Sequence, residues 1–249
     1  MSDYYSDVIL ADGPVGYWRL NDAVGSGTVA DSSGNGYTGT VNGGVTLGET
    51  GFLASAATCA KFDGSTGYIS CATANYFTGG DISVEGWILQ LVRQPWARLL
   101  DFGNGPASDN IFVTTSAGNN DGPTMFGVYQ GATASQWGTP GLEALGQWYH
   151  FVGVLSGTDQ VMYVNGVAVV TNTGSVVDNN VSRADNYIGH SNWAGDSYYN
   201  GYLAEVAVYN KALTAQQVAN HYAAGCMNPG KPGFLGPGVS FQPPVYPQL

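Results

Sequence analysis

Hydrophobic residues occur along this chain in short runs and not at a helical period. Val, Ile, Tyr, Phe and Trp gather in segments that clusters of Gly, Asn, Asp and Ser separate, which is typical of many strands joined by tight turns. Residues 160–164 alternate and lead into Asn165-Gly166, a strong hairpin signal, so a second strand is expected to return through 167–170. The other predicted strands are 15–20, 60–62, 68–71, 82–91, 98–102, 110–114, 124–129, 148–155, 186–188 and 201–209.

One segment has the pattern of a helix. Thr214 and Gln217 form a capping box, and Gly225 is placed to end the helix. Val218 and Tyr222 share one face, so this face is expected to pack on a sheet. His221 lies off that apolar stripe and is expected to be solvated. The sequence therefore predicts a single short helix that follows the last strand.

The composition changes sharply after this helix. Residues 226–249 are rich in proline and glycine, which favours an extended chain and excludes a helix or a central strand. We therefore divide the chain into a β domain, 1–225, and an extended tail, 226–249. The tail carries spaced apolar residues, so we expect it to lie on its own domain or on a neighbouring subunit as an anchor.

Charge excludes several partners. Lys and Arg number 7 against 18 Asp and Glu, which gives a net charge of −11, and the cations are scattered singly. Nucleic acid is therefore not an expected partner, because phosphate binding requires clustered cations. No run of about 18 apolar residues predicts a membrane span, and the acidic N-terminus lacks the features of a signal peptide. Neutral polar ligands and cations remain possible.

Several stretches together resemble the laminin-G-like and concanavalin A-like lectin and glucanase jelly rolls. The resemblance extends over roughly residues 4–225, and it depends on the order of the stretches because no single one is specific. It implies an all-β, two-sheet antiparallel jelly-roll sandwich, in agreement with the strand pattern, and it implies that Trp18, Trp87, Trp148 and Phe151 belong to the core. The stretches are 17–22, 31–39, 62–64 with 68–69, 82–87, 148–152, 163–166 and 201–214.

Catalysis is not expected. Related glucanases carry two acids about two residues apart on one strand, because a retaining pair of carboxyl groups sits about 5–5.5 Å apart. None of Glu49, Glu85, Glu143 and Glu205 has an acidic residue two positions away. The chain also lacks a G-x-S-x-G nucleophile elbow. The sequence therefore favours a non-enzymatic protein over a glycoside hydrolase.

A calcium ion is the one cofactor that the sequence suggests. Asp31 and Asn35 lie in a Gly-rich loop of oxygen donors, which Ca²⁺ prefers. In related jelly rolls such a loop meets an acidic pair on the closing strand, which implies Glu205 as a third ligand. This chain has Ala204 where the relatives commonly carry the first acid of that pair. The alternative interpretation is a simple Asx turn in the loop.

Sugar binding is expected in an aromatic loop. Sugar sites in β-sandwiches combine an exposed aromatic ring with planar polar side chains. The loop 191–200 has both, and two further tryptophans, Trp137 and Trp96, are secondary candidates. A subunit contact through the same aromatic residues is an equally good interpretation. The predicted carbohydrate-binding residues are Asn192, Trp193, Asp196, Tyr198, Tyr199 and Trp137.

Three cysteines, Cys59, Cys71 and Cys226, are too few for a disulfide framework in a chain of 249 residues. We expect reduced, buried thiols. Cys59 and Cys71 flank a turn at 63–66, however, and a hairpin there would bring them opposite each other and allow a disulfide.

Two functions remain. The first is a bacteriophage surface protein of the capsid-decoration or fibre type, made in the host cytoplasm, whose jelly roll faces outward from the virion and whose tail contacts other virion proteins or copies of itself. The absence of a signal peptide, the Pro-rich tail and the Gly-rich lectin-like body favour it. The second is a free carbohydrate-binding module or adhesin. The net charge of −11 favours neutral glycans as ligands in either case.

Overall fold

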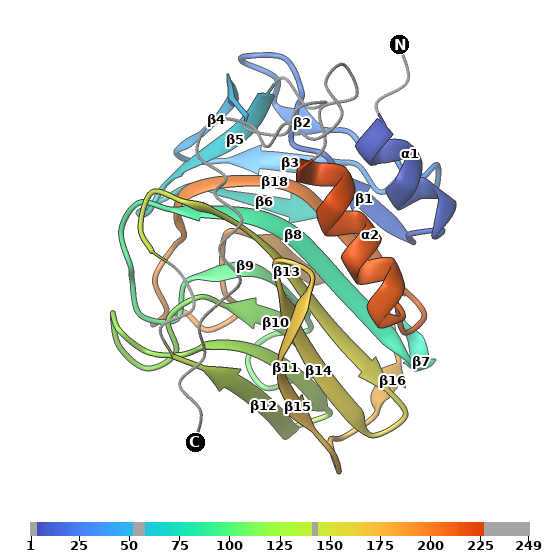
Figure 1. Ribbon diagram of the computed structural model, residues 1–249. Helices are drawn as coiled ribbons and strands as arrows, with labels where there is room; N and C mark the ends of the chain where they lie inside the picture. The colour runs from blue at the N-terminus through green and yellow to red at the C-terminus, as the bar shows by residue number, and fades with distance from the viewer. Residues whose placement is uncertain (1–3, 52–57, 141–143, 227–249) are drawn as a thin grey trace.

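Two antiparallel β-sheets pack face to face in the computed structural model, which describes residues 4–51, 58–140 and 144–226 (Figure 1). The jelly-roll sandwich predicted from the sequence is confirmed. Each sheet contains eight strands in the described parts of the chain, and a small third sheet pairs β7 (Thr78–Gly80) with β16 (Asp178–Asn180). The predicted tail lies outside the described residues except for Cys226, which is the last residue of the C-terminal helix, so Gly225 does not end that helix as predicted.

The first large sheet, here called sheet A, carries the helices on its outer face. Its strand order is β15 (Val167–Asn172), β14 (Asp159–Val164), β13 (Trp148–Ser156), β8 (Ile82–Gln90), β18 (Asn200–Tyr209), β5 (Thr58–Asp63) and β4 (Val45–Thr50), with β1 (Gly16–Trp18) paired to β18 off this path.

The second large sheet, sheet B, carries the candidate site described below. Its strand order is β12 (Thr133–Thr139), β11 (Thr124–Gln130), β10 (Ile111–Thr114), β9 (Arg98–Gly103), β17 (Asp185–Ile188), β6 (Tyr68–Cys71), β3 (Gly39–Asn42) and β2 (Thr28–Val29).

The predicted hairpin is confirmed. Val164 of β14 faces Val167 of β15, and Asn165 and Gly166 form the turn between them. Both turn residues have positive φ, 50° and 78°, as a type I′ turn requires.

The main core fills the space between the sheets. Side chains along β8 alternate between the two faces of sheet A: Val84 and Ile88 face this core, while Glu85 and Trp87 face the opposite side. Trp18, Trp87 and Phe151 are buried as predicted. Trp148 is only partly buried and packs against the cluster on the outer face of sheet A.

Two helices cover the outer face of sheet A (Figure 1). The predicted helix is present as α2 (Ala215–Cys226), and its capping box is confirmed because the Gln217 amide nitrogen of the backbone donates to Thr214 Oγ1 at 3.2 Å. A second helix, α1 (Tyr4–Ala11), was not predicted. Tyr5 and Ile9 of α1 are fully buried against sheet A and α2, so tertiary packing stabilises this short helix. None of the described helices is long and apolar enough to span a bilayer.

The disulfide considered above does not form. Cys59 lies on β5 of sheet A and Cys71 on β6 of sheet B, because the turn between them carries the chain from one sheet to the other. Cys59, Cys71 and Cys226 are free, buried thiols, and burial raises the pKa of each.

Candidate functional site

The aromatic loop crosses the outer face of sheet B above β9. Its anchor is Asp101, a fully buried carboxylate at the centre of that face. The backbone and side-chain nitrogens of Asn192 donate to Asp101 at 3.1 and 3.0 Å, and the Asn110 side chain donates at 2.9 Å. These bonds fix the loop against the sheet.

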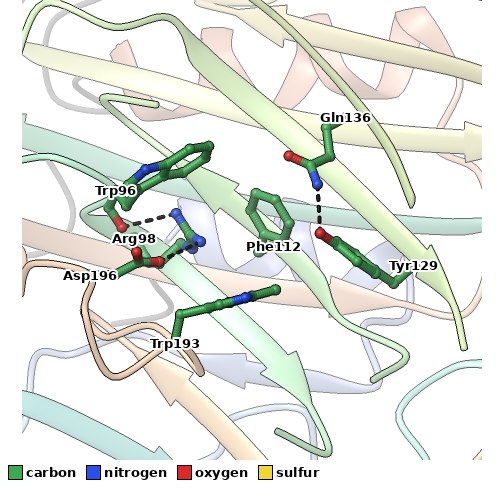
Figure 2. Close-up of a pocket in the computed structure, with 7 residues that line it drawn as sticks. All are labelled: Trp96, Arg98, Phe112, Tyr129, Gln136, Trp193 and Asp196. Carbon is green, nitrogen blue, oxygen red and sulfur yellow. Dashed lines mark hydrogen bonds and ion pairs between the residues drawn. The ribbon is translucent and has the colours of Figure 1, made fainter. Parts of the chain in front are cut away.

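A pocket with a cavity volume of about 280 Å³ lies beside this loop. Figure 2 shows the indoles of Trp96 and Trp193 on opposite sides of the Arg98 guanidinium, with the Phe112 ring next to it. The strands β9 to β12, the segment before β9 and the loop all contribute to the lining. The lining residues are Trp96, Arg98, Phe112, Tyr129, Gln136, Trp193 and Asp196.

Arg98 organises the pocket. It is only 2% exposed, and its guanidinium carbon lies 4.4 Å from the centre of the Phe112 ring. The same carbon lies 5.4 and 5.6 Å from the ring centres of Trp96 and Trp193, so the cation is surrounded by aromatic faces. Its nitrogens donate to the Trp96 carbonyl at 2.9 Å and to Asp196 at 3.0 Å, and Nε lies 3.5 Å from Asp101.

Aromatic rings form the rest of the wall. The centre of the Tyr129 ring lies 6.3 Å from that of Phe112 and 5.7 Å from that of Trp193. Gln136 donates from Nε2 to the Tyr129 hydroxyl at 2.7 Å, which orients both side chains. Gly127 opposite Phe112 makes room for the ring, since a Cβ there would lie 2.3 Å from it.

The pocket combines one buried cation with two carboxylates. Burial lowers the pKa of Arg98, although Asp101 and Asp196 both oppose that shift. Burial raises the pKa of Asp196, against the hydrogen bond from Ser191 and the charge of Arg98. Three of the five N–H groups of Arg98 donate within the protein, and Asp196 uses Oδ2 for both of its bonds, so donors and one carboxylate oxygen remain for a ligand.

The structure brings together part of the predicted sugar site. Trp193 and Asp196 line the pocket, and so does the secondary candidate Trp96. Asn192 instead holds the loop: its amide nitrogen donates to Asp101 and its oxygen accepts from the Gly105 backbone at 3.2 Å. Tyr198 stacks on a histidine beside the pocket and does not line it.

Tyr199 and Trp137 lie away from the pocket. Tyr199 is fully buried and packs against Phe62 in the main core, so the prediction that it contacts a ligand is wrong. Trp137 is 42% exposed, but it faces Phe126 across the strand pair. Phe126 is a core residue, so Trp137 lies on the opposite face of β12 from Gln136, which lines the pocket.

Sequence reasoning missed Arg98, Phe112, Tyr129 and Gln136 as site residues. Only Arg98 gave a usable signal: a charged residue within a predicted buried strand requires a partner, and Asp101 stands three positions later. The other three look like ordinary strand residues, and only sheet pairing brings them together.

The predicted calcium ligands are engaged with the protein itself. Asp31 accepts from the backbone of Tyr17, Ser33 and Tyr37 at 3.0, 2.9 and 2.9 Å, and the bond from Ser33 is the Asx turn of the alternative interpretation. Asn35 donates to the Val15 carbonyl at 2.9 Å.

Glu205 is fully buried and lies in a bulge of β18 with a positive φ of 54°. It accepts from Arg19 at 3.1 Å and from the Tyr17 hydroxyl. In the described parts of the chain, no three His, Cys, Asp or Glu side chains form a group that could hold a metal ion.

Calcium binding by Asp31, Asn35 and Glu205 stays a prediction with a direct test. If these residues share an ion, chelation should lower the melting temperature, because a ligand that binds only the native state stabilises it. Thermal unfolding with 5 mM calcium and with excess chelator measures this effect. Superimposable melting curves would leave the Asx turn as the whole role of this loop.

A second group of titratable side chains lies beneath the helices. Glu85 of β8 is fully buried and accepts from the Tyr209 hydroxyl, and its Oε2 lies 3.0 Å from His150 and 3.1 Å from His221. The other ring nitrogen of His221 lies 2.9 Å from Asp12. The prediction that His221 is solvated is therefore wrong: its side chain is fully buried between α2 and sheet A.

Comparison with known proteins places this architecture in a family. The model of the concanavalin A-like lectin/glucanases superfamily matches residues 63–219. No curated protein sequence matches the chain.

Solved structures share the fold at low sequence identity. Domain 4 of an extracellular GH43 arabinanase from Geobacillus stearothermophilus, in complex with arabinotriose, is 19% identical with a TM-score of 0.64, covering 84% of this chain and 98% of its own. The botulinum neurotoxin serotype G binding domain is 13% identical (TM-score 0.63), and the match covers 84% of this chain and 50% of that one. A Trypanosoma rangeli sialidase is 18% identical (TM-score 0.62), with 84% and 33% coverage.

Proposed function

This chain belongs to the concanavalin A-like lectin/glucanases superfamily, and from this premise we propose that it binds carbohydrate in the pocket on the outer face of sheet B. The observation that carries the proposal is the pair of indoles, Trp96 and Trp193, on either side of a buried arginine (Figure 2). The Geobacillus domain that shares the fold over almost its whole length was solved with arabinotriose, which supports the same ligand class.

The pocket has the two kinds of surface that a sugar ring requires. The faces of Trp193 and Tyr129 offer apolar area against the C–H face of a pyranose or furanose. Asp196 Oδ1, Gln136 and the remaining Arg98 N–H groups offer acceptors and donors for hydroxyls. Arg98 is held by Asp101 and Asp196, so these groups are fixed before a ligand arrives, which lowers the entropic cost of binding.

The charges of the pocket favour a neutral sugar. Arg98 faces two carboxylates, Asp101 and Asp196, so the site as a whole is not positive. The chain also carries a net charge of −11, which disfavours sulfated and sialylated glycans.

We expect Trp193→Ala to weaken binding to neutral glycans at least tenfold, or about 1.4 kcal/mol, because it removes one wall of the pocket. A multivalent form of the protein on a glycan array, followed by calorimetry on the best ligand, measures the loss. The matched control is Trp137→Ala, which removes an exposed indole from the other face of sheet B's edge strand and should leave binding unchanged.

Melting temperatures distinguish a binding role from a packing role. Trp193 is partly exposed, so its truncation should leave the melting temperature nearly unchanged. The contrary outcome is that the wild-type protein binds no neutral glycan and that Trp193→Ala unfolds or dissociates it. Trp193 would then be a subunit-contact residue.

The proposal is for binding without hydrolysis. Glu85 and Glu205, the buried glutamates of sheet A, are both engaged by neighbouring side chains beneath the helices and lie on the opposite side of the sandwich from the pocket. Incubation with the bound oligosaccharide and measurement of new reducing ends tests this part of the proposal.

We also propose that the domain is displayed in many copies on a virion, as a capsid-decoration or fibre protein. An open pocket of this size is expected to give an affinity near ~1 mM, so adhesion requires many copies acting together. The tail, 226–249, is the proposed contact to other virion proteins or to further copies. The test is whether purified virions contain this protein in stoichiometric amounts. If they do not, a free carbohydrate-binding module is the remaining function.

A further inference from the structure

Four ring side chains gather beside the pocket, on the other side of the aromatic loop. Tyr68 of β6 and Tyr187 of β17 lie on neighbouring strands with their ring centres 5.6 Å apart. His190, just before the loop, and Tyr198, within it, stack on each other at 4.3 Å with an angle of 10° between their planes. His190 also lies 5.1 Å from Tyr68 and 5.2 Å from Tyr187, so the four rings form one cluster.

The polar tips of this cluster are largely unpartnered. The hydroxyls of Tyr68 and Tyr198 and both ring nitrogens of His190 make no hydrogen bond to the described residues, and His190 Nδ1 is shielded from solvent without a partner. Tyr187 alone is bonded, to Asp185 at 3.4 Å. Partly exposed rings with unsatisfied tips suit a ligand that stacks and also carries hydroxyl groups.

The cluster shares its sheet face with the pocket. Asp101 on β9 pairs with Phe112 of the pocket on one side and with Tyr187 of the cluster on the other. Phe112 and Tyr187 therefore lie two strand spacings apart, roughly 10 Å. The charges of Asp196 and Arg98 also act on His190, with opposite effects on its pKa.

We propose that Tyr68, Tyr187, His190 and Tyr198 form a second subsite for a further sugar residue of the same neutral glycan chain that occupies the pocket. This inference rests on the proposed function. The cluster and the pocket adjoin on one face of sheet B, so a single glycan chain can extend from the pocket onto the cluster. Burial lowers the pKa of His190, so near pH 7 the ring is neutral and offers a nitrogen that accepts a bond from a sugar hydroxyl.

The length of the oligosaccharide distinguishes binding in the pocket from binding in the second subsite. The probes are neutral monosaccharides and their homo-oligosaccharides of up to five residues from arabinan, xylan, glucan and galactan series. In calorimetry, the wild-type protein should bind the longer oligosaccharides at least fivefold more tightly than the monosaccharide. Tyr198→Ala should keep the affinity for the monosaccharide and lose this gain, while Trp193→Ala should weaken binding at every length.

Two controls accompany this measurement. Tyr198→Phe keeps the stacking ring and should retain most of the gain with chain length. Trp137→Ala should behave as the wild type at every length, and an unchanged melting temperature of Tyr198→Ala shows that the partly exposed ring is not needed for folding.

The outcomes distinguish this inference from the proposed function. Binding that depends on Trp193 but not on chain length or Tyr198 would overturn the second subsite alone. Binding to none of the probes, or binding that Trp193→Ala leaves unchanged, would overturn the pocket and the subsite together.

Discussion

Replacing Arg98 by methionine is expected to destabilise the protein by about 3–5 kcal/mol at pH 7. The substitution removes the cation that faces the fully buried Asp101, so this carboxyl group must either stay charged without a counterion or take up a proton, and both are costly at pH 7. Methionine retains much of the apolar contact with Phe112, so the loss reports the charge more than the packing. Urea unfolding of the wild type and the variant measures the difference.

The effect of this substitution should depend on pH in a defined direction. Burial already raises the pKa of Asp101 above its ordinary value, and loss of Arg98 raises it further. The variant can therefore keep Asp101 protonated in the folded state at low pH, so the penalty is small below about pH 4 and grows as pH rises. Adding Asp101→Asn to Arg98→Met should recover part of the loss.

Arg93→Met provides the matched control. Arg93 lies in the same segment before β9 but is partly exposed, so its removal should change stability by no more than about 1 kcal/mol. A loss below 1 kcal/mol for Arg98→Met would show that the pocket does not depend on the buried ion pairs.

Sequence patterns predicted the local structure of this chain well, because turns and strand alternation are local. Asn165-Gly166 determines the hairpin between β14 and β15 without reference to the rest of the molecule. The turn at 63–66 was also recognised, but its pattern does not show which sheet the next strand joins. That single ambiguity made Cys59 and Cys71 look like neighbours when they lie on different sheets.

Site residues were predicted correctly only where the residue types of one loop were enough to indicate a binding site. Trp193 and Asp196 stood out as an aromatic and a carboxylate in a polar loop, and both line the pocket. Trp137 stood out for the same reason, yet a shift of one residue along β12 decides which face a side chain occupies, and Gln136 is the residue that faces the pocket. Strand pairing, which sets these faces, is a long-range property.

The helices cover the outer face of one sheet only, which explains why the candidate pocket lies on the other sheet. Helices α1 and α2 close the outer face of sheet A over a second buried cluster, so β8 is buried on both faces. Both described helices pack on sheet A, and the aromatic loop lies against the outer face of sheet B. The sequence did not show this asymmetry because α1 was not recognised and His221 was interpreted as a surface residue.

His221 is the group through which helix docking should respond to pH. Its Nδ1 faces Glu85 on β8 and its Nε2 faces Asp12, the residue after α1, so both nitrogens require a proton. Burial opposes the charged form, but Glu85 and Asp12 outweigh it and raise the pKa of His221 to about 9. Burial lowers the pKa of the neighbouring His150, and the two histidines hold the pKa of Glu85 well below its ordinary value against the effect of burial.

We therefore expect the free energy of unfolding to fall by about 3 kcal/mol between pH 6.5 and pH 9. The unfolded chain has a histidine pKa of about 6.5, so the stabilisation from His221 is complete below that pH and is lost as pH rises through the folded-state pKa of about 9. His221→Gln cannot titrate, so the variant should be less stable at pH 6.5 and should lack most of this slope.

Denaturant unfolding at half-unit intervals of pH tests the expectation. His190→Gln is the matched control and should keep the wild-type slope, because His190 follows a strand of the other sheet and has no carboxylate bonded to it. Ionisation of the buried thiols also lowers the free energy of unfolding as pH rises above about 8.5, because burial raises their pKa in the folded state. This contribution is the same in both proteins, so the difference in stability between the wild type and His221→Gln isolates the histidine. A difference that stays constant from pH 6.5 to 9 would mean that His221 is neutral in the folded protein, and that one of its two carboxylate contacts holds the helices without a charge on the ring.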